Sequence, residues 1–254
     1  DQEERIRLEA DVLKQMIQQV AFAAATDDAR PALTGVSTTF DGAQAHMVAT
    51  DGFRLSMRSA HIPGYVEPGF SIIIPARSLM DVARVIDDDL EAVYLSIPEG
   101  RKQAVFDMEN VVLVSQLIDG NFPDYKPILP TKRSTRTVLN TADFRKACKT
   151  ADIFARESSN TARITVETGE EMSPAFVVVA ATSIETGDNK AQIDADVDGE
   201  PIEIALNVKY MSEVLSVIDT PQVALETTSS REPGVIKPVG DNDFMHMIMP
   251  LQFG

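Results

Sequence analysis

Residues 10–24 read ADVLKQMIQQVAFAA and residues 142–156 read ADFRKACKTADIFAR, and this repeated stretch decides the fold. Apolar residues recur at helical spacing in both copies, so each stretch predicts an amphipathic helix. Identical residues stand 132 positions apart: Ala10 and Ala142, Asp11 and Asp143, Lys14 and Lys146, Phe22 and Phe154, Ala23 and Ala155. One constant offset indicates a duplicated module rather than a solenoid, whose repeats are about 20–50 residues long.

The same offset holds at two further places. A helix opened by Pro75 and running to Ile86 falls opposite residues 207–218, and a strand at residues 112–117 falls opposite residues 244–249. The sequence therefore predicts an α+β protein: a tandem of two modules, each with two helices packed on antiparallel sheet of about eight short strands. The proline-rich, polar stretch at residues 127–136 predicts the linker, with modules at residues 1–129 and 130–254.

The first strands of the first module are predicted at residues 35–40, 45–50 and 53–59, and further ones at 71–74, 92–97, 103–108 and 111–118. Asp51 and Gly52 lie between the second and third of these strands, and this pair is typical of a two-residue type I′ hairpin turn.

Length and composition favour a globular protein of two domains. The chain has 254 residues, of which 44% are hydrophobic and 24% charged, so a core can form and wholesale disorder is excluded. No apolar run reaches the roughly 20 residues of a membrane span, and no secretory signal is expected. A single cysteine, Cys148, excludes a disulfide framework and a cysteine-based zinc site. We expect a soluble protein of a reducing compartment.

Charge is distributed unevenly along the chain, whose net charge is −16. The four predicted helices, residues 9–24, 76–86, 141–156 and 208–218, hold eight basic and six acidic residues, so they carry +2 and the remainder −18. Arg145, Lys149 and Arg156 share one stripe of the third helix. Such helices could attract a polyanion to one side of the protein, but ordinary solvated helix faces explain the pattern equally well.

The motifs that could carry catalysis or bind metal are incomplete. Residues 194–199 resemble the start of an EF-hand loop, but its twelfth position, which needs a bidentate Glu, is Ala205. His46, His61 and His246 show no ligand spacing. The sequence therefore predicts no catalytic residues, no metal site and no cofactor.

The C-terminal strand is rich in methionine. Residues 244–251 read FMHMIMPL. Flexible methionine suits surfaces that accept varied partners, but it also fills gaps in cores, so both interpretations stay open.

Four motifs together resemble one family. Residues 49–55 (ATDGFRL), 119–125 (DGNFPDY), 207–210 (NVKY) and 249–251 (MPL) are similar to the bacterial sliding clamp, the beta subunit of DNA polymerase III. The resemblance covers the whole chain but only the second and third of the three modules in that family. It implies that this sequence is a fragment or a shortened relative.

The resemblance implies how the family handles DNA. Its members close head to tail into a dimeric ring, with helices lining the hole, and hold double-stranded DNA without reading its sequence. The residues expected to face DNA are Lys14, Arg77, Arg84, Arg145, Lys149, Arg156 and Lys209. The last module of one chain meets the first module of the other, so we expect this chain by itself to be a monomer or at most a weak dimer. The implied location is the bacterial cytoplasm.

The resemblance also implies a pocket between the two modules that binds short linear motifs of the replicative polymerase, the clamp loader and repair proteins. The matching positions are Leu33, Thr50, Gly52, Arg54, Leu55, Pro123, Ile128, Asn207, Tyr210, Met247, Met249, Pro250 and Leu251. Phe53, Pro127 and Gln252 depart from the residues common in the family, which affects the polar rim of the pocket more than its floor.

Two functional hypotheses follow. The favoured one is a non-enzymatic processivity clamp that tethers replication proteins to DNA. The rival is a two-module peptide-binding scaffold that never encircles DNA. An enzyme is the weakest of the alternatives, because the usual catalytic constellations are missing from the sequence.

Overall fold

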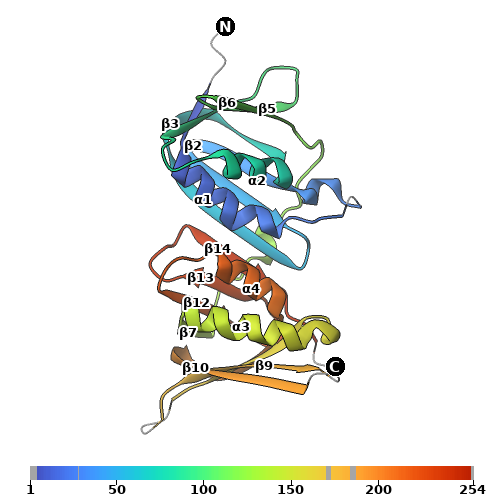
Figure 1. Cartoon of the computed structure of the whole chain (residues 1–254), viewed down its shortest axis with the longest axis vertical. Coiled ribbons are helices and arrows are strands. Elements are labelled where there is room, and N and C mark those ends of the chain that lie inside the picture. Colours follow the sequence, from blue (N-terminus) through green and yellow to red (C-terminus); the bar gives the residue numbers. More distant parts are fainter. Residues whose placement is uncertain (1–4, 28, 170–172, 184–186, 253–254) are drawn as a thin grey trace. The chain divides into compact units, whose positions relative to one another are not determined.

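The computed structural model describes residues 5–27, 29–169, 173–183 and 187–252, and the chain divides into two compact units (Figure 1). The first unit is Asp1–Asp124 and the second is Tyr125–Gly254. This division lies a few residues before the one expected from the sequence, between residues 129 and 130, because the 3-10 turn Lys126–Ile128 belongs to the second unit. The outer ends of the two expected modules, residues 1–4 and 253–254, lie outside the described residues.

The first unit packs two helices on antiparallel strands. Its elements are β1 (Ile6–Glu9), α1 (Ala10–Val20), β2 (Gly35–Thr50), β3 (Arg54–Pro75), α2 (Ala76–Val85), β4 (Ala92–Ser96), β5 (Gln103–Met108) and β6 (Val111–Gln116), with 3-10 turns at Ala21–Ala23 and Pro31–Thr34. One sheet has the order β1-β4-β5-β6, and β2 and β3 form a long antiparallel hairpin. Both helices contact β2, β3 and each other, so Ile17 and Leu79 are buried in the core.

The second unit has the same kind of architecture. Its elements are β7 (Thr135–Asn140), α3 (Thr141–Ala155), a 3-10 turn (Arg156–Ser158), β8 (Thr161–Glu167), β9 (Phe176–Ser183), β10 (Gly187–Gly199), β11 (Ile202–Asn207), α4 (Val208–Ser216), β12 (Gln222–Thr227), β13 (Gly234–Pro238) and β14 (Phe244–Ile248). Its strands are antiparallel in the order β11-β8-β9-β10-β7-β12-β13-β14. α3 packs on α4 and on β9 and β10 (Figure 1).

The duplication predicted from the sequence is visible in the order of the strands. The sheet β1-β4-β5-β6 of the first unit corresponds to the run β7-β12-β13-β14 of the second, and α1 and α2 correspond to α3 and α4. The predicted α+β tandem is confirmed.

The helices begin where the sequence predicts, and local chemistry explains two of the starts. Pro75 is the N-cap residue of α2. The side-chain oxygen of Asn140 accepts a hydrogen bond of 3.1 Å from the amide of Asp143 in the first turn of α3. The prediction of two separate strands at residues 35–40 and 45–50 was wrong. They form one strand, β2, because the irregularity between Phe40 and Gln44 shifts its register on β3 without ending the pairing.

A carboxylate with three cations around it fastens the linker to the second unit. Glu226 on β12 pairs with Arg133, Arg136 and Lys237 at 2.5, 3.7 and 2.8 Å. Burial by itself raises the pKa of Glu226, but hydrogen bonds and charges from Lys237 and Arg133 outweigh it and hold that pKa below its ordinary value. The backbone amide of Ser134 adds a hydrogen bond of 2.9 Å to Thr227.

In each unit, a cation on the first helix binds carbonyl oxygens at the C-terminal end of the second. Lys14 Nζ on α1 donates a hydrogen bond of 2.9 Å to the carbonyl of Ile86, which directly follows α2. Arg145 on α3 donates two bonds of 2.7 Å, from Nε to the carbonyl of Leu215 and from Nη2 to that of Ile218. The last carbonyls of a helix lack intrahelical partners and carry the negative end of its dipole, so a cation there is stabilising.

Among the described residues, no helix is long and apolar enough to cross a membrane.

We expect Lys14→Met and Arg145→Met each to lower the free energy of unfolding by about 1–3 kcal/mol, because each removes a charged donor from partly buried carbonyls. Urea unfolding followed by circular dichroism measures the change. Lys146→Met is the matched control, since Lys146 is exposed beside Arg145, and should change stability by no more than about 0.5 kcal/mol. Equal losses in Arg145→Met and Lys146→Met would contradict this role.

Candidate functional site

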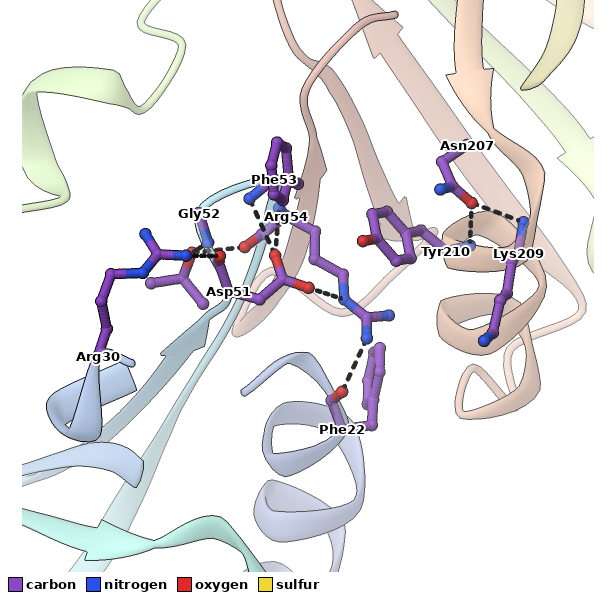
Figure 2. A network of polar contacts seen from close by, with 10 residues as sticks. Phe22, Arg30, Asp51, Gly52, Phe53, Arg54, Asn207, Lys209 and Tyr210 are labelled. Atoms are coloured by element: carbon purple, nitrogen blue, oxygen red, sulfur yellow. Dashed lines mark hydrogen bonds and ion pairs between the residues drawn. The ribbon is translucent and has the colours of Figure 1, made fainter. Parts of the chain in front are cut away.

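The loop between β2 and β3 is braced from inside by Asp51 (Figure 2). The last paired residues of the hairpin are Thr50 and Leu55, with four residues between them, so the predicted two-residue turn was wrong. One carboxylate oxygen of Asp51 accepts hydrogen bonds from the amides of Phe53, at 2.9 Å, and Arg54, at 3.1 Å. An aspartate that binds its own following amides stabilises this longer turn in place of a type I′ hairpin.

Thr50 closes the same loop from the other side. Its hydroxyl donates a hydrogen bond of 2.6 Å to the carbonyl of Arg54 and accepts one of 3.1 Å from the amide of Gly52. Gly52 has a φ of +95°, a conformation that residues with a Cβ rarely adopt. The loop therefore has one preferred shape, in which the side chain of Phe53 is 62% exposed.

Arg54 supports this loop as well as belonging to the candidate peptide site. Its side chain is buried, and Nε lies 3.0 Å from the second carboxylate oxygen of Asp51. Nη2 donates a hydrogen bond of 3.1 Å to the carbonyl of Phe22, and the guanidinium lies 5.5 Å from the centre of the Phe22 ring (Figure 2). The charge of Arg54 is thus offset by Asp51, which makes the group a rigid part of the loop.

Sequence analysis missed Arg30. Its Nη2 donates a hydrogen bond of 2.9 Å to the carbonyl of Asp51, and its guanidinium lies beside Gly52 (Figure 2). Arg30 precedes the 3-10 turn Pro31–Thr34, 21 positions from Asp51. No local pattern in the sequence links the two positions.

In the second unit, the candidate residues gather where β11 meets α4. Asn207 ends β11 and caps α4, accepting hydrogen bonds from the amides of Lys209, at 3.0 Å, and Tyr210, at 3.2 Å (Figure 2). The C-terminal tail reaches the same strand, because the amide of Leu251 donates a hydrogen bond of 2.9 Å to the carbonyl of Ala205.

The methionine-rich C-terminal segment has some methionines packed in the core and others at the surface. Met247 is buried in β14, Met245 is half-buried, and Met249 is 37% exposed just after the strand ends. Pro250 and Leu251 are half-buried. Core packing therefore explains Met247, while Met249 belongs to an accessible tail.

The thirteen candidate peptide-binding residues divide between the units. The first unit holds Leu33, Thr50, Gly52, Arg54, Leu55 and Pro123, and the second holds Ile128, Asn207, Tyr210, Met247, Met249, Pro250 and Leu251. Leu33 and Leu55 are buried, whereas Pro123 and Ile128 are exposed.

Three of the seven residues expected to face DNA already have partners within the chain. Lys14 and Arg145 donate to the helix ends described above, and Arg84 lies 2.5 Å from Asp81 in an exposed ion pair. The exposed remainder comprises Arg77, Lys149, Arg156 and Lys209. The sequence could not separate these two groups, because a lysine on a helix face looks the same whether it points to solvent or to a neighbouring helix.

The exposed face of α3 carries a further cation, Lys146, which was not among the residues expected to face DNA. Lys146, Lys149 and Ile153 line a shallow hollow of about 320 Å³ on that helix. Lys146 is exposed, and its helical spacing from Lys149 was already visible in the sequence.

The titratable side chains of the described residues bear on two kinds of chemistry, metal binding and thiol reactivity. None of its His, Cys, Asp and Glu side chains form a group of three or more placed to hold a metal ion. Cys148 is fully buried on α3, and burial raises the pKa of its thiol, so it stays a neutral, unreactive group. Asp194, Asp196 and Asp198 alternate along β10 as exposed strand residues.

These two units define a tandem of α+β modules with helices packed on antiparallel sheets, which is the class of protein to which the comparisons also lead. Residues 7–124 match the family model described as DNA polymerase III beta subunit, central domain, and residues 126–252 match the one described as its C-terminal domain. The chain belongs to the DNA polymerase III beta subunit family.

Named relatives agree with this assignment. The chain is 30% identical over 249 residues to the Beta sliding clamp of Bacillus subtilis, covering 97% of this chain and 64% of that relative. It is 31% identical over 251 residues to the Beta sliding clamp of Staphylococcus aureus strain Mu50, covering 98% and 64%. The chain therefore spans 64% of the length of these relatives.

Solved structures show the same fold. The crystal structure of the DNA polymerase sliding clamp from Bacillus subtilis matches with a TM-score of 0.92 at 29% identity, covering 100% of this chain and 66% of that one. The beta subunit from the DNA polymerase of Streptococcus pyogenes matches with a TM-score of 0.91 at 26% identity, covering 100% and 67%.

We expect Asp51→Ala to loosen the loop, because it frees two amides and the guanidinium of Arg54 together. Hydrogen exchange measured by mass spectrometry should become about tenfold faster or more at residues 52–55, which corresponds to a local loss of at least about 1.4 kcal/mol. Asp41→Ala makes the same change at an exposed position of β2 and should leave these residues unaffected. Unchanged exchange in Asp51→Ala would show that the loop does not depend on this carboxylate.

Proposed function

We propose that this chain is the central and C-terminal part of a DNA sliding clamp, a non-catalytic protein of the bacterial cytoplasm that tethers replication proteins to DNA. The match of both units, in order, to the two consecutive beta-subunit domains carries this proposal. Relatives named Beta sliding clamp at 30% and 31% identity support it.

In this proposal, the exposed helix cations contact DNA weakly and without regard to its sequence. Arg77, Lys149, Arg156 and Lys209 lie on helices or the turn that follows α3, and Lys146 joins them. Phosphate contacts from such side chains are electrostatic and carry no sequence information. A clamp that slides needs contacts of this kind, because any single strong contact would hold it in place.

The proposal also includes capture of short peptides by the loop at Asp51–Arg54 in the first unit and the tail at Met249–Leu251 in the second. The loop is braced by hydrogen bonds, and the tail is fixed to β11 through Leu251, so both would be formed before a peptide arrives. Preformed surfaces reduce the entropy lost on binding. We expect an affinity in the roughly micromolar range, on the order of −8 kcal/mol.

Ring formation separates the clamp from the rival two-module scaffold. In the family, the closed ring is a dimer in which the last module of one chain meets the first module of the other. We therefore propose that the full-length form is a homodimeric ring and that the present chain by itself is monomeric. Sedimentation of both forms, together with retention on circular but not linear DNA, distinguishes a ring from a scaffold.

We expect the double variant Lys149→Ala/Arg156→Ala to weaken binding to a 30-base-pair duplex. Two lost phosphate contacts should reduce the slope of log affinity against log salt by about 2. Fluorescence anisotropy between 50 and 200 mM salt, roughly the range over which such contacts are screened, measures this. Lys132→Ala/Lys190→Ala removes the same charge from exposed positions off the helices and should change the slope less. Equal effects of the two double variants would mean that the helix cations contribute no more to DNA binding than other exposed cations, which would contradict this part of the proposal.

Deleting residues 249–254 should abolish peptide binding while the chain stays folded. The deletion removes exposed Met249 and the Leu251 hydrogen bond to Ala205 but leaves buried Met247 in place. Calorimetry with a ten-residue peptide from the clamp-binding segment of a bacterial polymerase measures the loss. Deleting only residues 252–254 is the control and should retain binding. Equal affinities of the longer deletion and the intact chain would mean that the tail has only a packing role.

A further inference from the structure

A groove of about 1160 Å³ lies on the first unit, away from every residue discussed above as binding DNA or partner peptides. It is bounded by the start of β1, by residues 62–70 of β3 and by the turn that joins β4 to β5. This volume is somewhat larger than the roughly 300–1,000 Å³ usual for ligand pockets, so it has room for a short stretch of extended chain.

The floor of the groove is apolar, while its more exposed parts are polar. Ile62 and Leu95 are buried members of the core of the first unit, and Val66, Phe70 and Ile97 pack against that core while remaining partly exposed. The floor of the groove is therefore formed by the edge of this core. Side chains of a bound segment would gain the hydrophobic free energy of burial there.

The rim of the groove carries a small excess of positive charge, although the chain as a whole is acidic. Its lining residues include Arg5, Arg7 and Arg101 against a single carboxylate, Glu99, while the whole chain carries −16. Arg5 lies 3.1 Å from Asp107 and is thereby neutralised. Arg7 and Arg101 take part in no ion pair with the residues that the structure describes, so their charges are available to a ligand. Arg101 is exposed in the β4–β5 turn.

We propose that this groove binds an acidic peptide segment of a partner protein, with apolar side chains on the floor and carboxylates at Arg7 and Arg101. The charges of Arg7 and Arg101 favour an acidic ligand, and the apolar floor favours a peptide over a nucleic acid. A single-stranded nucleic acid needs a track of cations and several aromatic platforms, whereas Tyr65 is the one strongly exposed aromatic residue in the lining. This site is additional to the proposed clamp function and does not depend on it.

Selection from a random ten-residue peptide library on phage tests the proposal. Selection uses the immobilised chain, after depletion on the double variant Arg7→Glu/Arg101→Glu. The surviving peptides should be enriched in Asp or Glu together with Leu, Ile or Phe. No enrichment over the double variant, or enrichment of neutral or basic peptides, would overturn the proposal.

The most enriched peptide, labelled with fluorescein, then serves as the probe in anisotropy. Arg101→Glu should weaken its binding at least tenfold, and raising the salt concentration should weaken it further. Arg231→Glu makes the same charge reversal at an exposed position of the second unit and should have no effect. Equal losses in the two variants would mean general electrostatic attraction and overturn the proposal. Because Arg101→Glu changes an exposed turn, an unaltered thermal midpoint should accompany the loss.

Competition separates this groove from other occupants and from the proposed clamp pocket. Deletion of residues 249–254 should leave binding of the probe unchanged, so this site and the tail can fail independently. Displacement of the probe by a 20-nucleotide poly-dT strand would point to nucleic acid instead. Loss of probe binding in a full-length form would show that the region not spanned by this chain covers the groove. Displacement by poly-dT and loss of binding in the full-length form would each overturn the proposal.

Discussion

A cation from the first helix binds the end of the second helix in each unit, and much of the structure follows from this contact. Lys14 reaches the carbonyl after α2, and Arg145 reaches two carbonyls at the end of α4. Each contact joins the positive side chain of one helix to the negative end of another helix dipole. Burial of the apolar stripe of each helix sets which faces point away from the sheets, and the cation then joins the ends of the two helices.

The same contact determines which cations remain for a polyanion. The helices were nearly balanced in charge to begin with, and two of their cations are used internally, so the exposed remainder is small. Lys149 and Arg156 on and after α3 are the clearest members of this remainder. In the proposed clamp, a sparse set of exposed charges on an otherwise acidic protein would give weak, salt-sensitive contact with DNA, and such contact is compatible with sliding.

The proposed capture of peptides would depend on a different kind of constraint, which is the rigidity of short segments. The Asp51 carboxylate fixes the β2–β3 loop, and the backbone bond from Leu251 fixes the tail on β11. Neither segment relies on a large buried area of its own. Both are held by hydrogen bonds to groups nearby, so a single substitution such as Asp51→Ala can loosen one of them without unfolding its unit.

The sequence by itself determined the duplication, the four helices and the α+β class, because a repeated amphipathic pattern and local caps such as Asn140 act over a few residues. It also identified the family through four short motifs. Tertiary structure decided the rest. Arg145 binds carbonyls at the end of α4, and Arg30 binds the carbonyl of Asp51, 21 positions away. Residues 35–50 form one strand. The physical reason is that a long charged side chain can reach several partners, and only the packed positions of helices and strands select one of them.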